Sequence, residues 1–170
     1  MEEKKITTPA IKALIISLVL IVLSVAVITM NQMGNNAWNL ASFAVYMLGI
    51  IWACISFSKQ MDANVTFGNV FSHGFKTSAG VAALLALWIF VSMKFIFPDA
   101  MDSIAEIQRA AMEKQGLSEN DIDNAMERAK GFTMPLMVVG SVFMYLVVGA
   151  ISALIGASIA KKNPNTNMPA

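Results

Sequence analysis

Four long stretches of the sequence carry almost no ionisable side chains. They run at about 10–30, 37–57, 77–97 and 134–160, and polar or charged connections separate them. About 20 helical residues match the ~30 Å hydrocarbon core of a bilayer, so each stretch has the length of one membrane crossing. Strands would cross only in a closed barrel, and the alternation typical of barrel strands is missing. The sequence therefore predicts an all-α fold, an integral membrane four-helix bundle that forms one domain over residues 1–170.

The first two connections predict how the spans are arranged. The uncharged turn at 31–36 is short, so spans one and two are expected to be antiparallel neighbours. After Thr66, a candidate N-cap, apolar residues recur with helical spacing. This pattern predicts an interfacial helix at about 66–76 that lies on the membrane surface or runs directly into span three. Its apolar face consists of Phe67, Val70, Phe71, Gly74 and Phe75.

The charged segment at about 98–131 is predicted to be a helical hairpin inserted between spans three and four. Gly116 fits the end of the first helix, and Ser118 with Asp121 three positions later resembles a capping box for the second. Each half combines an apolar stripe with an acidic face. We expect the hairpin to pack on the end of the bundle, with its acidic side chains in solvent or against a partner or cation.

Composition and charge narrow the class of partner. The chain is 56% hydrophobic and 14% charged, whereas soluble domains average about 25% charged residues. A net charge of +1, with no run of more than two Lys or Arg, gives no attraction to nucleic acid. The single Cys54 allows no intrachain disulfide and no thiolate metal cluster. We expect the lipid bilayer as the main partner, no nucleic acid, and no cofactor or metal.

The distribution of Lys and Arg predicts the orientation of the chain. These residues prefer the cytoplasmic side when they lie near span ends. With both termini inside, seven lysines face the cytoplasm, and five basic residues face outward together with eight acidic residues of 98–131. The sequence therefore predicts a cytoplasmic N-terminus and a cytoplasmic C-terminus. Lys12, near the start of span one, is expected to extend its amine into the headgroups.

One polar stripe is the best candidate for a ligand site. Asn69, His73 and Lys76 lie three or four residues apart on the second face of the helix predicted at 66–76. His73 is the only histidine, and imidazole titrates near neutral pH. A stripe of this kind can line the cytoplasmic mouth of a small-solute channel or transporter. It can equally be a solvated face that contacts lipid headgroups, and the sequence leaves both interpretations open.

Span four carries two rows of small residues at four-residue spacing. The rows are Gly149, Ala153 and Ala157, and beside them Ser152, Gly156 and Ala160. Small side chains let membrane helices approach closely and pack through van der Waals contact. This face is a candidate helix-packing surface, either inside one chain or between two chains.

The sequence contains no pattern that favours catalysis. It has no Gly-rich phosphate loop, no G-x-S-x-G and no H-E-x-x-H, and no Asp, Glu or Arg lies inside a span. We therefore expect a non-catalytic structural or interaction protein, not an enzyme, that assembles with itself or another membrane protein through its last span. The alternative is a small-solute channel or transporter component with a polar site at Asn69 and His73.

The layout resembles a known family. The stretch from Phe67 to Lys76, with its F-G-x-x-F-x-x-G-F pattern, leads into span three, and a long charged loop precedes a Gly-containing last span that ends at Lys161 and Lys162. These features are similar to those of small four-span bacterial membrane proteins grouped as domain of unknown function 4199. The resemblance covers nearly the whole chain and implies a bacterial inner-membrane location. It implies no activity and no catalytic residue.

Overall fold

The computed structural model describes residues 6–163, which form helices joined by short connections and contain no strand. Four helices are long and apolar enough to cross a membrane, so the predicted all-α, four-span fold is confirmed. They are α1 (Pro9–Thr29), α2 (Asn36–Gln60), α3 (Phe67–Val91), which a π-helical turn η1 (Ser92–Ile96) extends, and α6 (Thr133–Ile159). The predicted hairpin consists of α4 (Ala100–Lys114) and α5 (Glu119–Ala129).

Polar residues define where several helices begin. Thr8 caps α1 just before Pro9, Asn35 Oδ1 accepts from Ala37 N at 2.9 Å, and Thr66 Oγ1 accepts from Asn69 N at 3.2 Å. These side chains satisfy backbone N–H groups that have no partner inside the helix. Ser118 Oγ does the same for Asp121 N at 3.3 Å, as its position in the predicted capping box requires.

The segment at 66–76 is not a separate interfacial helix. It forms the first turns of α3, which continues without a break through Thr77. The hydroxyl of Thr77 donates to the carbonyl of His73 at 2.9 Å, and no proline interrupts the backbone hydrogen bonds at this junction. Of the two arrangements that the sequence allowed, the structure has the one in which this segment runs directly into span three.

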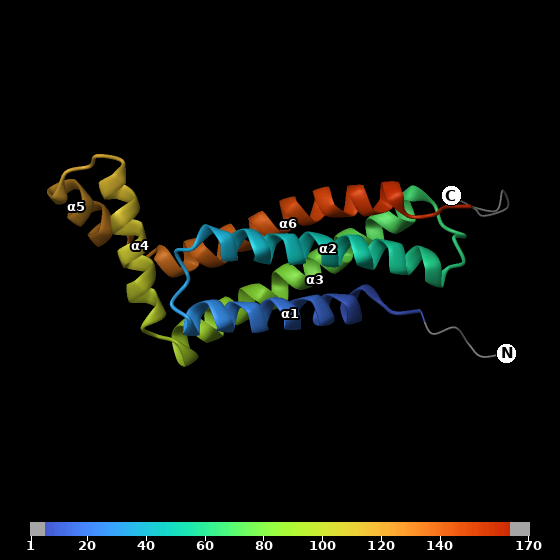
Figure 1. Ribbon diagram of the computed structural model, residues 1–170, viewed down its shortest axis with the longest axis horizontal. Helices are drawn as coiled ribbons and strands as arrows, with labels where there is room; N and C mark the ends of the chain where they lie inside the picture. Colours follow the sequence, from blue (N-terminus) through green and yellow to red (C-terminus); the bar gives the residue numbers. More distant parts are fainter. Residues whose placement is uncertain (1–5, 164–170) are drawn as a thin grey trace.

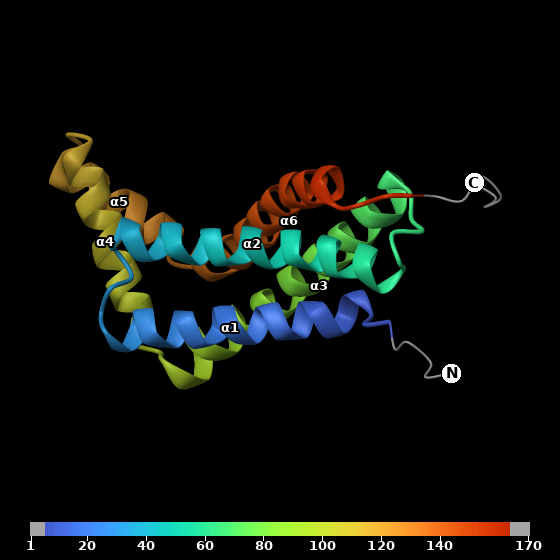
Figure 2. The ribbon, with the colours of Figure 1, turned by 45° about the vertical axis from the view of Figure 1, so that its right-hand side comes forward.

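The four long helices run alongside one another, and α3 is the central one, because it packs against α1, α2 and α6. Figures 1 and 2 show the α4–α5 hairpin lying across one end of this bundle. We call this the hairpin end. At the opposite end, which we call the terminal end, α1 begins and α6 finishes (Figure 1). An even number of crossings brings these two helix ends to the same side.

Candidate functional site

The small-residue rows of α6 lie against α2 and α3. Gly149, Ser152, Ala153, Gly156 and Ala157 are buried, and Ala160 at the end of the helix is 4% exposed. A methyl group at position 156 would lie 2.8 Å from the Cβ atom of Cys54. The candidate helix-packing face therefore holds three helices of one chain together, and its side chains are not available to a second chain in this arrangement.

A polar cluster joins α2, α3 and α6 in the middle of the bundle. The hydroxyl of Tyr46 donates to the carbonyl of Tyr145 at 2.6 Å and lies 2.7 Å from Ser78 Oγ. The two tyrosine rings meet edge to face, with their centroids 5.1 Å apart. Gly149 faces this cluster so closely that a methyl group there would overlap Ser78 and Tyr46. The sequence shows these residues only as isolated polar positions in three different spans, so nothing in it links them.

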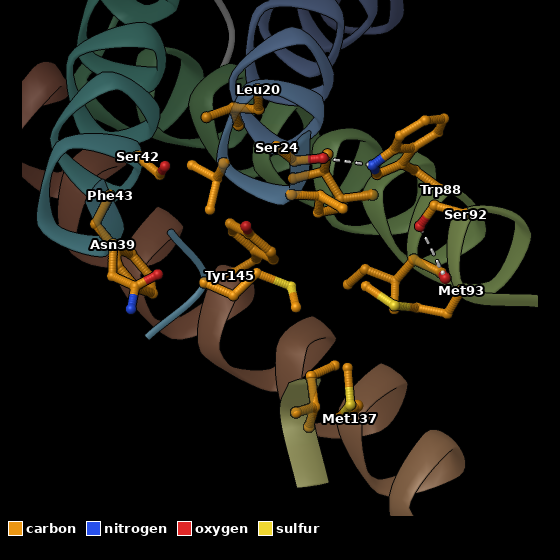
Figure 3. A pocket seen from close by; sticks show the side chains of 16 residues that line it. Leu20, Ser24, Asn39, Ser42, Phe43, Trp88, Ser92, Met93, Met137 and Tyr145 are labelled. Atoms are coloured by element: carbon orange, nitrogen blue, oxygen red, sulfur yellow. Dashed lines mark hydrogen bonds between the residues drawn. The ribbon is translucent and has the colours of Figure 1, made fainter. Parts of the chain in front are cut away.

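A cavity of about 290 Å³ lies on the hairpin side of this cluster. Figure 3 shows its walls, which come from all four long helices and are mostly apolar, with Leu20, Phe43 and Met137 among them. The indole N–H of Trp88 donates to Ser24 Oγ at 2.7 Å and joins α3 to α1 at the wall of the cavity. Such a cavity can hold a lipid chain or the apolar part of a small molecule.

A second, more polar recess of about 400 Å³ opens at the terminal end. It contains the whole predicted stripe of Asn69, His73 and Lys76, together with Ser72 of the same helix face. The sequence did not indicate that Pro9, Phe57 and Gly68 would complete it. Asn69 and Lys76 are exposed, as a solvated stripe would be, but His73 is only 6% exposed. The recess therefore has an open polar rim and a buried imidazole.

The imidazole of His73 is fixed by stacking. Its ring lies on the ring of Phe57 with the centroids 4.1 Å apart and the planes 12° from parallel. The Nε2 atom is buried and has no hydrogen-bond partner in the described part of the chain. A buried nitrogen of this kind is rare, because an unpaired polar atom loses its hydration without compensation.

Lys12 is the second buried basic side chain beside the recess. Its amine donates to the carbonyl of Ala53 at 3.2 Å and lies 5.9 Å from the centroid of the Phe57 ring. The expectation that Lys12 extends into the headgroups is wrong, since the residue is fully buried. Its spacing explains this result, because Ile16 and Leu20, four and eight residues later, also face the core.

Charge is divided between the two ends of the bundle. Within residues 6–163, the terminal end has one acid, Asp62, and five lysines: Lys12, Lys59, Lys76, Lys161 and Lys162. The hairpin end has eight acids and five basic residues. Arg109 of α4 pairs with Asp123 of α5 within the hairpin. No group of three or more His, Cys, Asp or Glu that could hold a metal occurs in the described residues. The recess is therefore an electropositive site built from nitrogen and hydroxyl donors.

Comparison with known proteins gives a family and no activity. No curated protein and no solved structure matches the chain. A protein-family model described as "Protein of unknown function (DUF4199)" matches residues 12–162. That range covers most of the chain. It includes the hairpin, the lysines after α6, and all four spans apart from the first three residues of α1. The chain therefore belongs to the DUF4199 family.

Proposed function

We propose that this protein is a non-catalytic, multi-pass protein of the bacterial inner membrane that assembles with a second membrane helix through the first half of α6. The supporting observation is the uneven burial of that helix. Its second half contains five buried residues, whereas no residue between Thr133 and Val148 is buried by the rest of the described chain. Tyr145 and Val148 pack against the core, but the side of this half that carries Leu136, Val139 and Phe143 is exposed in the described chain.

Gly140 lies near the centre of this half, at an exposed position. A methyl group at position 140 would meet no atom within 4 Å, so the glycine is not needed for packing inside the chain. Glycine in a helix is less favourable than alanine by about 1 kcal/mol. Large exposed side chains flank it at helical spacing, namely Leu136, Phe143 and Met144. A hole between large side chains lets a second helix approach closely, and close packing drives association of helices in lipid.

We propose a second copy of the chain as the first partner to test, because this face suits a two-fold contact. Two copies inserted in the same orientation can meet across an axis normal to the membrane, with the hole at Gly140 of each chain facing the other. The face carries no charge that would oppose such pairing. Another membrane protein with a helix of similar shape is the alternative partner.

The test compares two substitutions that each place a leucine in lipid-facing space at similar depth. Gly140→Leu fills the hole, and Ala44→Leu adds the same side chain to an exposed position of α2. We expect light scattering in detergent and cross-linking in membranes to give a dimer for the wild type and Ala44→Leu, and a monomer for Gly140→Leu, with unchanged thermal unfolding. A wild type that is monomeric in both media and co-purifies with no partner would contradict the proposal.

A small-solute transporter is the second candidate, and the unpaired His73 Nε2 in the recess is the observation that favours it. An open channel fits less well, because the cluster around Tyr46 and Gly149 packs α2, α3 and α6 tightly together in the middle of the bundle. Flux of small solutes into liposomes, lost on His73→Ala, would support a transporter. Absence of flux for every solute class tested would remove this candidate.

A further inference from the structure

We propose that the recess at the terminal end binds a compact oxyanion, a phosphate or carboxylate group. The inference does not depend on assembly through α6. Every polar side chain that lines the recess can donate a hydrogen bond, and no carboxylate lines it. Lys76, which also lines the recess, and the neighbouring Lys12 both lie within electrostatic reach of His73. A cation would be repelled there, whereas an anion would be attracted.

The donors form one row along α3. Asn69, Ser72, His73 and Lys76 follow one another at three- or four-residue spacing and so share a helix face. The Oδ1 atom of Asn69 already accepts from the hydroxyl of Thr66, which leaves its amide N–H groups free. Ser72 Oγ and Lys76 Nζ make no hydrogen bond within residues 6–163. The row therefore offers several unused donors and no unused carboxylate.

His73 contributes a buried ring nitrogen that no group of the described chain satisfies. The residue is only 6% exposed, yet its Nε2 atom has no hydrogen-bond partner in the described chain. In a neutral imidazole whose Nε2 carries the proton, this atom is a donor that an oxyanion can satisfy. Stacking on Phe57 fixes the ring, and the buried amine of Lys12 on the same Phe57 ring adds positive charge behind it. The imidazole and the amine are thus held in place before any ligand arrives.

The start of α3 adds to this attraction. Gly68 belongs to its first turn, where the helix dipole favours negative charge, and its backbone N–H, unlike that of Asn69, is not used by the Thr66 cap. A methyl group at Gly68 would meet only Thr66 Oγ1, at 3.9 Å, so a ligand can approach the backbone there. The start of a helix alone does not define an anion site, but the start of α3 lines the same recess as the buried imidazole of His73.

The depth of the recess suggests two sources for the anion. The helical segment from Phe67 to Ile96 has 30 residues, or about 45 Å at 1.5 Å per residue, which exceeds the ~30 Å core of a bilayer. The excess length allows the first turns of α3 to lie at headgroup level. An anionic lipid headgroup and a free anion from the aqueous side can both reach the recess, and both present the same phosphate chemistry.

The experiment measures thermal unfolding of the full chain in detergent with added inorganic phosphate, short-chain phosphatidylglycerol or short-chain phosphatidylcholine. We expect stabilisation by phosphatidylglycerol, by phosphate or by both, and none by phosphatidylcholine. Stabilisation by phosphatidylglycerol alone identifies a lipid site, and stabilisation by phosphate identifies a site for soluble anions. If neither anion stabilises the protein more than phosphatidylcholine does, the inference is wrong.

Two variants and one matched control locate the effect. Lys76→Gln and Ser72→Ala remove donors that make no contact on which the fold depends, so both proteins are expected to fold. A lost hydrogen bond to a charged group should weaken binding by about tenfold or more. Lys59→Gln removes an exposed lysine at the same end but outside the recess. Equal weakening by Lys59→Gln, or no weakening by Lys76→Gln, would overturn the inference.

Discussion

Lys12 places a primary amine inside the bundle with a single hydrogen bond, to Ala53 O. No acidic residue among residues 6–163 pairs with it. Replacing a buried ion by an apolar side chain of similar size is often neutral or stabilising, because the ion no longer has to be desolvated. We expect Lys12→Met to raise the free energy of unfolding by about 1–2 kcal/mol, measured by thermal unfolding in detergent.

The matched control for this prediction is Lys59→Met, since Lys59 is exposed at the same end of the bundle. It should leave the unfolding temperature unchanged. A Lys12→Met protein that unfolds at a lower temperature than the wild type would show that the amine contributes net stability. If stability rises while phosphate or phosphatidylglycerol binding falls, the buried amine is kept for the ligand and not for the fold.

Gly149 permits the closest contact of α6 with its neighbours. A methyl group there would overlap Ser78 Oγ and the hydroxyl of Tyr46, so these side chains or α6 itself would have to shift. Overpacking of this kind destabilises by about 1–3 kcal/mol, and loss of the hydrogen bonds in the cluster would add to it. We expect Gly149→Ala to lower the unfolding temperature clearly, whereas Gly131→Ala, with nothing within 4 Å, should not.

At the level of residues, the sequence identified part of the recess. The spacing of Asn69, His73 and Lys76 was enough to place them on one face of a helix. It could not show that Phe57 of another helix covers His73, because contacts between helices leave no trace in the periodicity of either one. Lys12 could have been recognised as buried from its four-residue spacing to Ile16, but its charge favoured the headgroup position instead.

The continuity of α3 can be tested at the junction that a surface helix would have required. Proline at position 76 removes a backbone hydrogen bond and clashes with the carbonyl four residues earlier, which costs about 3 kcal/mol inside a helix. Lys76 is exposed, so the effect of Lys76→Pro comes from the backbone. We expect a large loss of thermal stability for Lys76→Pro and none for Lys76→Gln. Wild-type stability of Lys76→Pro would indicate a natural break in the helix there.

Elements with strong local signals were predictable, and their exact junctions were not. Ser118 caps α5 and Gly116 has a positive φ of 80°, as the hairpin predicted from these two residues requires. The π-helical form at the end of span three could not be predicted. Five residues there form the π-helical turn η1, in which Phe97 N donates to Ser92 O at 2.7 Å. Nothing in the local sequence distinguishes this turn from an ordinary α-helical one.

For the whole molecule, the number of spans follows from hydropathy, whereas the packing order does not. Length and apolar character define four crossings, because the bilayer sets the same requirement for every span. The central position of α3 depends on how small residues from different helices meet. Gly80 of α3, for example, allows contact with Ala13 of α1, where a methyl group would lie 2.8 Å from Ala13 Cβ. Many residue pairs in the sequence could have made such a contact.

The charge difference between the two ends predicts the orientation of the bundle. Five lysines against one acid lie at the terminal end of the described chain, so this end should face the cytoplasm. We expect a membrane-impermeant maleimide to label Asn35→Cys and Ser118→Cys from outside intact spheroplasts, and Asn163→Cys only in inverted vesicles. The wild type is the internal control, because Cys54 is fully buried and should stay unlabelled. Labelling of position 163 from outside would reverse the orientation and would move the anion recess to the outer surface.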